Sequence, residues 1–290
     1  MYKDAQGKIW YKGNLHMHTR ESDGAYTPEE ALELYLAHGY DFVARTEHWK
    51  VSPASEYKGM LLLSGCEYDV GRKPKDGIYH ILAIGAEGEM RLERGCGPQE
   101  MIDEIHRAGG LAGLAHPAWS LNSDSQISAL QGIDFIEIYN SVSGMPRNAR
   151  PYSGVLLDTL ASRGYFYPLV ATDDTHFYYE ADTCRSFIFV QAKECSREAI
   201  LEAMRAGRYY ASQGPILDVQ KIDGKIVVHS SEVEEIVYFT DSAWSKHRAD
   251  VGHDLTYGEY EPLPTDTFVR VEVKDEDGNY AWWQYIELAR

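Results

Sequence analysis

Short apolar runs alternate with amphipathic segments through the first two thirds of the chain. The runs have the length of buried strands, and the segments between them place apolar residues at helical spacing. We expect eight strands, over residues 13–19, 41–46, 60–67, 80–85, 111–116, 135–140, 167–172 and 186–191. This alternation is typical of βα units around a parallel sheet, so the sequence predicts an α/β barrel-like domain.

The helix expected after residue 27 has recognisable signals at both ends. Thr27 can cap its first turn, Glu30 completes a capping box, and Gly39 follows its last residues. Two further helices are expected over 98–108 and 196–206, and each is followed by glycine. These segments predict ordinary helices that pack one face against the core.

The pattern changes after residue 214. Beyond it, short alternating runs are separated by turn sequences such as Asp223-Gly224, which is typical of hairpins. Strands are expected over 216–222, 226–230, 235–240, 267–274 and 280–288. The sequence therefore predicts two domains, an α/β domain over 1–214 and a small all-β, sandwich-like module over 215–290.

Composition limits the classes of function. The 290 residues include 28 Lys and Arg against 45 Asp and Glu, a net charge of −17, which argues against binding a nucleic-acid duplex through a basic surface. No apolar stretch approaches the roughly 20 residues of a bilayer span, so we expect a cytoplasmic protein without a membrane partner. The spacing of the cysteines suggests neither a disulfide framework nor a thiolate zinc site; they are Cys66, Cys96, Cys184 and Cys195.

Six of the 11 histidines lie close to the ends of the predicted strands. His16 and His18 form an HxH pair on one strand, where both imidazoles would point to the same side, as two ligands of one metal must. Loops from all strands of a parallel barrel meet at its carboxyl-terminal face. The residues expected to meet there are His16, His18, Asp23, His48, Glu67, His80, His116, Asp174 and His176. Nitrogen and oxygen ligands without sulfur favour zinc, manganese or iron(II).

Each of these residues also has an ordinary structural explanation. His80 could be a hydrogen-bonded core histidine, Glu67 a paired carboxylate and Asp23 a turn former. Taken together, however, they place an imidazole or a carboxylate near the end of nearly every predicted strand. A shared metal site accounts for that placement with a single cause.

In chain order these residues resemble the motifs of the PHP (polymerase and histidinol phosphatase) metallohydrolases. The motifs appear as His16-Met17-His18, Ser22-Asp23-Gly24, Thr46-Glu47-His48, Glu67, His80, Ala115-His116-Pro117 and Asp174-Thr175-His176. The resemblance covers residues 13–191. It implies a distorted (β/α)7 barrel that holds two or three divalent metal ions (Zn, Mn or Fe).

The resemblance also implies how the ligands are shared. It places His16, His18, Glu67 and Asp174 on a first ion, Asp23, His48 and the bridging Glu67 on a second, and His80, His116 and His176 on a third. Glu47 departs from the pattern, because the family usually has Asp there; the position supports ligands rather than binding metal. The Asp-x-His spacing selects Asp174 as the ligand and leaves Asp173 to orient its neighbours.

The C-terminal part is similar to a subgroup of the family. Residues 198–215 resemble the closing segment of PHP proteins that carry a β extension. The ending over 270–282 is similar to that of the CehA/McbA-like proteins, which include enzymes acting on an aryl carbamate ester. This similarity implies that hydrolysis of a non-phosphate ester or a carbamate remains an alternative to phosphoester hydrolysis.

Divalent ions bridged by a carboxylate can activate a water at neutral pH, and the same ions can clamp phosphate oxygens. The leading expectation is therefore a phosphoesterase that hydrolyses a small phosphomonoester or nucleotide by attack of a metal-bridging hydroxide. If one metal is absent or exchanges, Asp174 and His176 are candidates for helping to protonate the leaving oxygen. The arginines considered for binding the phosphate are Arg147, Arg150, Arg20 and Arg45.

Three functions stay open at this point. The first is the phosphoesterase, and an arginine beside the metals would favour it. The second is the ester or carbamate hydrolase, which a mostly apolar cavity without an arginine would favour. The third is a non-catalytic module with structural metals, which a sealed site would favour.

Overall fold

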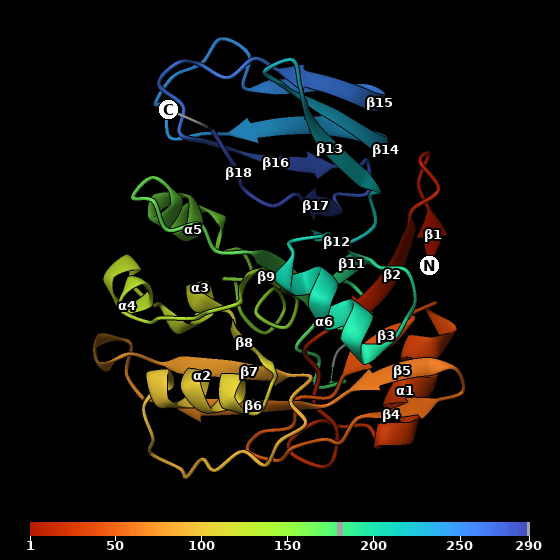
Figure 1. Ribbon diagram of the computed structural model, residues 1–290, viewed down its shortest axis with the longest axis vertical. Coiled ribbons are helices and arrows are strands. Elements are labelled where there is room, and N and C mark those ends of the chain that lie inside the picture. Colours follow the sequence, from red (N-terminus) through yellow and green to blue (C-terminus); the bar gives the residue numbers. More distant parts are fainter. Residues whose placement is uncertain (179–181, 289–290) are drawn as a thin grey trace.

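The computed structural model describes residues 1–178 and 182–288 and has a mixed α/β architecture (Figure 1). The larger sheet follows the order β13 (Leu217–Ile222), β14 (Lys225–Phe239), β16 (Phe268–Lys274), β17 (Tyr280–Trp282), β12 (Tyr209–Ser212), β11 (Phe187–Gln191), β2 (Ile9–Asn14), β3 (Phe42–Ala44), β5 (Met60–Leu63) and β4 (Ser55–Tyr57). Beside this path, β1 (Tyr2–Lys3) pairs with β2, β15 (Ala249–Tyr260) with β14, and β18 (Ile286–Glu287) with β16. The second sheet follows the order β10 (Leu169–Thr172), β9 (Phe135–Asn140), β8 (Leu111–Leu114), β7 (Tyr79–Ile84) and β6 (Gly65–Val70).

The helices are short and connect or cover the strands. They are α1 (Pro28–Ala37), α2 (Pro98–Arg107), α3 (Pro117–Ser120), α4 (Asp124–Ser128), α5 (Gly154–Ala161) and α6 (Arg197–Arg205), with a 3-10 turn at Pro74–Asp76. The capping box at the start of α1 is confirmed, since the Thr27 hydroxyl accepts from the amide of Glu30. The predicted α2 and α6 are confirmed to within a residue or two at each end. The helices α3, α4 and α5 were not predicted.

Within the described residues, the strands do not close into the expected (β/α)7 barrel. They form two open sheets, whose neighbouring edges meet at isolated bridges between Met17 and Thr175 and between His48 and Glu67. The run expected as one strand over 60–67 divides after Leu63, so that β5 lies in one sheet and β6 in the other. The α/β class is thus confirmed, and the closed barrel is not.

The second sheet is only partly parallel. β7 runs antiparallel to both β6 and β8. The connection over 71–78 is too short for the crossover of a dozen or more residues that a parallel pair requires, so β6 and β7 form a hairpin. As a result the first residues of β7, including His80, lie beside the last residues of β6, and His80 pairs in register with Asp69.

The HxH pair lies beyond the strand that was expected to carry it. β2 ends at Asn14, and the chain then leaves the ladder and pairs with the segment that follows β10, where His18 N donates to Thr175 O over 2.9 Å. The Asn14 amide donates to His16 O and so supports this change of partner. The pair consequently lies between the two sheets.

The C-terminal strands form the layer at the top of Figure 1. The expected hairpin at Asp223-Gly224 is confirmed as β13 and β14, but β14 continues to Phe239, so the strand expected over 235–240 is part of it. The strand β15 was not predicted. Since β17 pairs with β12, this layer continues the larger sheet, and the domain boundary at residue 214 stays a prediction.

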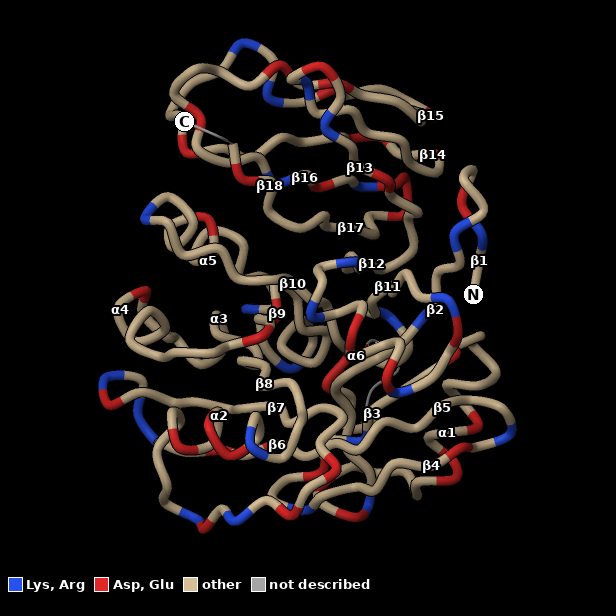
Figure 2. Tube along the Cα trace, in the orientation of Figure 1, with Lys and Arg blue, Asp and Glu red and all other residues tan. Residues whose placement is uncertain are grey.

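No helix among the described residues is long and apolar enough to cross a membrane. Acidic and basic residues are scattered over the described trace, and both kinds occur in its upper and lower parts (Figure 2).

Candidate metal centre

The nine predicted ligands come together from both sheets. His16 and His18 follow β2, Asp23 lies in the next loop and His48 follows β3. From the second sheet, Glu67 lies within β6 and His80 near the start of β7, while His116 follows β8 and Asp174 and His176 follow β10. Segments that are distant along the chain therefore supply one cluster of imidazoles and carboxylates.

Glu67 is at the centre of the cluster. Its side chain is 1% exposed, and its two oxygens face different imidazoles. The Oε2 atom lies 3.4 Å from His16 Nε2, 3.2 Å from His18 Nε2 and 3.3 Å from His48 Nδ1. The Oε1 atom lies 2.8 Å from His80 Nδ1 and 3.5 Å from His116 Nε2. A carboxylate in this position can bridge metal ions.

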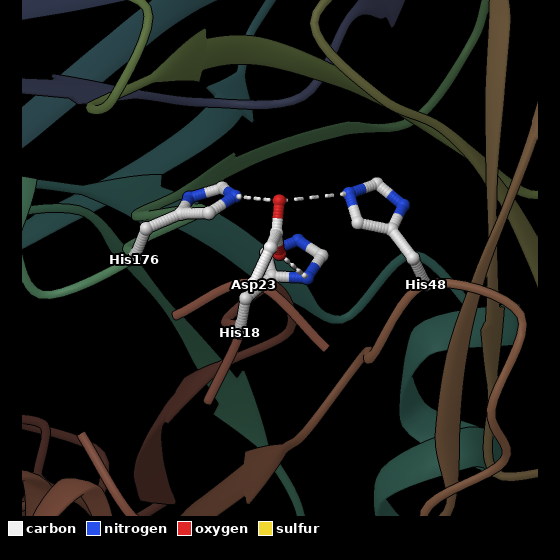
Figure 3. Close-up of side chains that lie close together, drawn as sticks. All are labelled: His18, Asp23, His48 and His176. Carbon is white, nitrogen blue, oxygen red and sulfur yellow. Dashed lines mark ion pairs between the residues drawn. The ribbon is translucent and has the colours of Figure 1, made fainter. Parts of the chain in front are cut away.

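The ligand atoms fall into three groups within metal-binding reach. They are His16, His18 and Asp174; His18, Asp23, His48 and His176; and Glu67, His80 and His116. In the second group, the Asp23 carboxylate lies between imidazoles, with Oδ2 3.4 Å from His176 Nε2 and 3.8 Å from His48 Nε2 (Figure 3). This grouping differs from the one implied by the family resemblance, since His176 joins Asp23 and His48 rather than His80 and His116.

The chemistry of the donor atoms fits metal ions. His16 Nε2, His18 Nε2, His48 Nδ1 and Asp174 Oδ1 are buried and have no hydrogen-bond partner. Asp174 Oδ1 lies 3.2 Å from His16 Nε2 and 3.1 Å from His18 Nε2, so these atoms face a common point. Buried polar atoms normally have partners, and unpartnered lone pairs that converge are what a cation needs.

The electrostatics of the protein alone also favour a cation here. Burial by itself would lower the pKa of His18, but the carboxylates of Asp174 and Glu67 outweigh it and raise the pKa to about 9. Burial would raise the pKa of Glu67, but His16 and His80 hold it well below its usual range. The carboxylates thus favour a positive charge at His18, and a bound metal ion would supply that charge in place of the proton.

Glu137 orients two of the ligands. Its Oε1 atom lies 2.8 Å from His16 Nδ1 and its Oε2 atom accepts from the amide of His116 over 2.7 Å. The Thr172 hydroxyl and the Asn140 amide also donate to this carboxylate. Sequence reasoning missed Glu137, although a carboxylate inside the apolar strand β9 was a usable signal.

Glu47 holds the loop that carries Asp23. Its buried carboxylate accepts from the amide and hydroxyl of Thr19, over 3.0 and 2.6 Å, and from the hydroxyl of Ser22 over 2.5 Å. The same loop passes so close to the HxH segment that a Cβ at Gly24 would lie 2.4 Å from His18 O. Although Glu is unusual at position 47 in the pattern, it anchors the ligand loop here.

Asp173 does not face the cluster. Its buried carboxylate accepts from the hydroxyl of Tyr35 over 2.6 Å and from the amides of Cys184, Arg185 and Ser186. Burial raises the pKa of Asp173 to about 6. Asp173 thus holds the start of β11 against β10, next to the ligand Asp174.

A cavity of about 220 Å³ opens beside the cluster. Besides seven of the predicted ligands, it is lined by Trp119, Val142, Ser143, Arg147 and Asn148. The ring of Trp119 packs edge-on against His80 and His116, with centroids 5.8 and 5.0 Å apart. The sequence favours the loop over 142–150 as a place where specificity lies, but it does not identify Ser143, Asn148 or Trp119 individually as cavity residues.

The four candidate arginines lie in different places. Arg147 lines the cavity, whereas Arg150 is not among its lining residues. Arg45 pairs with Glu21 over 2.9 Å, and Arg20 donates to Ala25 O over 2.7 Å. Arg147 is therefore the candidate that this geometry favours.

The fold is shared with a solved structure. A two-domain protein from Bacteroides vulgatus, described as containing a predicted PHP-like metal-dependent phosphoesterase, aligns over 99% of this chain and 98% of its own, with a TM-score of 0.56 and 18% identity. The chain has a PHP-like fold. No protein-family model and no curated protein matches the chain by sequence. The PHP-like fold is in keeping with the order of the motifs, and membership of the CehA/McbA-like subgroup stays a prediction.

Endonuclease Q is a further structural neighbour. The enzyme from Pyrococcus furiosus aligns over 68% of this chain and 56% of its own, with 17% identity and a TM-score of 0.48. A second endonuclease Q structure, with a TM-score of 0.49, 16% identity and coverages of 68% and 57%, holds a 27-mer duplex with an abasic lesion at the active site.

One expectation drawn from the sequence needs correction. The exclusion of a nucleic-acid duplex as a partner is wrong, because it was drawn from the net charge of the whole chain. A sum over all residues does not describe the field at one cavity, where metal ions and Arg147 can offset nearby carboxylates.

Proposed function

We propose that this protein is a metal-dependent phosphoesterase that hydrolyses a small phosphomonoester or a nucleotide. The observation that carries the proposal is the convergence of unpartnered, buried donor atoms of His16, His18 and Asp174 beside an open cavity. The description of the Bacteroides vulgatus protein, which has the same fold, supports the same class of reaction.

Two or three divalent ions, of zinc, manganese or iron(II), would be held by the nine clustered residues. Bound there, they would supply Lewis acidity toward the phosphoryl group and lower the pKa of a water for the attack. The trinuclear arrangement is supported by the three groups of ligand atoms, with Glu67 shared at their centre.

The chain itself would bind and orient the substrate. Arg147 would donate hydrogen bonds to the non-bridging phosphate oxygens, which offsets the negative charge that Asp23 and Glu67 present to an anion. Asn148 would donate to a further oxygen from the same wall. Where one of the ions is absent or exchanges, His176 Nε2, which faces Asp23 at the edge of the cavity, would hold the proton that the leaving oxygen takes up, with Asp174 beside it.

Hydrolysis of a carbamate or another non-phosphate ester is the second candidate. Trp119 and Val142 form an apolar part of the cavity wall and would accept an aryl group. Arg147, in contrast, favours an anionic substrate. A purely structural metal site has the least support, because structural sites are closed and this cluster borders a cavity.

A substrate panel tests the proposal. The purified protein is loaded in turn with manganese, zinc and iron(II) and assayed on phosphomonoesters, nucleotides, phosphodiesters, an abasic-site DNA duplex, carboxyl esters and aryl carbamates. We expect the highest kcat/KM with a phosphomonoester or a nucleotide, and no turnover after chelation. Faster hydrolysis of carbamates than of every phosphate ester would refute the phosphoesterase proposal.

A further inference from the structure

The loop over residues 141–151 forms one wall of the cavity. It connects β9 with α5 and supplies Val142, Ser143, Arg147 and Asn148 to the lining. Backbone hydrogen bonds close the loop on itself, from Arg150 N to Ser143 O and, at its base, from Asn140 N to Pro151 O, each over 3.0 Å. The position of this wall therefore depends on the residues that flank the base.

Both flanking residues contact the C-terminal strands. Tyr139 and Tyr152, which pair with each other in an isolated bridge, lie immediately before and after the loop's base. The ring of Tyr139 stacks on Trp282 of β17, with centroids 5.4 Å apart. The hydroxyl of Tyr152 donates to Glu272 Oε2 over 2.8 Å and accepts from Arg270 Nη2 over 3.2 Å, both on β16.

The partners of Tyr152 are themselves held firmly. Arg270 is fully buried, and its Nε and Nη2 atoms donate to the two carboxylate oxygens of Asp158, each over 2.8 Å. Its Nη1 atom donates to Glu272 Oε2 over 3.0 Å. A bidentate ion pair of this kind fixes the relative orientation of the two side chains. Separating a buried guanidinium from its partners costs a large free energy. Since Asp158 lies on α5, the cluster ties β16 to the helix that follows the loop.

We infer that the C-terminal strands position the 141–151 wall of the cavity through the Tyr152 hydroxyl, so that Tyr152 is a positioning residue for substrate binding. The kinetic part of this inference rests on the proposed function, because it needs a substrate. The C-terminal layer is then part of the binding site of the α/β region, although none of its residues lines the cavity in the described part of the chain.

The kinetic test uses Tyr152→Phe, which removes both hydrogen bonds and keeps the ring. The matched control is Tyr238→Phe, which also removes a buried hydroxyl that donates to a carboxylate, that of Asp250 over 2.9 Å, within the C-terminal strands. We expect Tyr152→Phe to raise KM about three- to tenfold with kcat and metal content unchanged, because the lost contact places a binding wall and no ligand. Tyr238→Phe should leave KM as in the wild type.

Limited proteolysis tests the inference without any substrate. Trypsin can cut the exposed loop after Arg147, and the cut is identified by mass spectrometry; the bond after Arg150 precedes proline and resists trypsin. We expect Tyr152→Phe to be cut after Arg147 at least severalfold faster than the wild type and Tyr238→Phe to be cut at the wild-type rate. If the wild type turns over no phosphate ester, the proposed function fails while this readout still decides the inference.

Two results would overturn the inference. One is an unchanged rate of cutting after Arg147 in Tyr152→Phe. The other is an equal acceleration in both variants, which would report general loosening of the fold rather than release of this wall.

Discussion

Glu67 concentrates much of the chemistry of the site in one side chain. It is buried, yet five imidazole nitrogens lie within 3.5 Å of its two oxygens. A buried carboxylate is costly unless it is paired, and here the pairing groups are themselves candidate metal ligands. Metal binding therefore depends on single side chains. The residues that orient the ligands matter as much as the ligands themselves.

Glu137→Gln tests that orientation. The variant keeps the size of the side chain but removes the negative charge that faces His16 Nδ1. We expect metal affinity to fall by about 10- to 100-fold, because losing a partner that orients a histidine ligand typically costs that much. Competition with a chelator of known affinity measures the change, and Glu56→Gln, at an exposed position, is the control. Affinity equal to the wild type would contradict the role of Glu137.

Arg147→Ala and Arg150→Ala form a matched pair on one loop. Only Arg147 lines the cavity, so Arg147→Ala should raise KM for a phosphate ester by about tenfold or more, as expected for loss of a hydrogen bond to a charged group. Arg150→Ala should change KM little. Steady-state kinetics distinguish the two variants. A larger rise in KM for Arg150→Ala than for Arg147→Ala would show that Arg150 binds the phosphate instead.

At the scale of elements, the loop after β2 depends on the segment after β3. Glu47 accepts three hydrogen bonds from Thr19 and Ser22, so two loops that lie far apart along the chain share one buried carboxylate. Asp23 follows directly after these contacts. The loop is thus set by an interaction between elements, not by its own turn residues.

Glu47→Ala should destabilise the protein as well as the site. It leaves one amide and two hydroxyls without their acceptor, and we expect the free energy of unfolding to fall by about 3 kcal/mol. Urea denaturation measures this. Glu21→Ala, which removes only surface ion pairs with Arg45 and Lys50, should cost less than about 1 kcal/mol. Equal costs for the two variants would show that the buried contacts of Glu47 are not the reason.

At the scale of the whole molecule, the candidate metal site lies where the two sheets meet. Its ligands follow β2 and β3 of the larger sheet and lie on or after β6, β7, β8 and β10 of the second. Among the described residues, the sheets meet there only by isolated bridges, not by a continuous ladder. Ions bound at this junction therefore crosslink the two halves of the fold.

Metal should consequently raise the melting temperature. A ligand that binds only the folded state stabilises by about 2.7 kcal/mol at 100 times its dissociation constant. We expect manganese or zinc to raise Tm by several degrees in differential scanning calorimetry and a chelator to reverse the rise. Glu67→Ala should abolish the response. A Tm that is insensitive to metal in the wild type would mean that the cluster binds no ion in the folded state.

Much of the local structure follows from local sequence. The capping box of α1 at Thr27 and Glu30 and the hairpin at Asp223-Gly224 lie where their residues predict, because both depend on contacts a few residues apart. The closed barrel was wrong for the opposite reason. The run over 60–67 divides after Leu63 and passes from one sheet to the other, and apolar periodicity carries no information about which sheet each part joins.

The sequence by itself determined which residues can bind metal, since the HxH pair, the Asp-x-His pair and the separate His and Glu positions specify nitrogen and oxygen donors in a fixed order. Only the tertiary structure decided how they are shared: that His176 joins Asp23 and His48, that Glu137 orients His16, and that Arg147 rather than Arg150 lines the cavity. The physical reason is range. Donor chemistry belongs to single side chains, whereas coordination depends on distances between atoms that the folding of two sheets brings together.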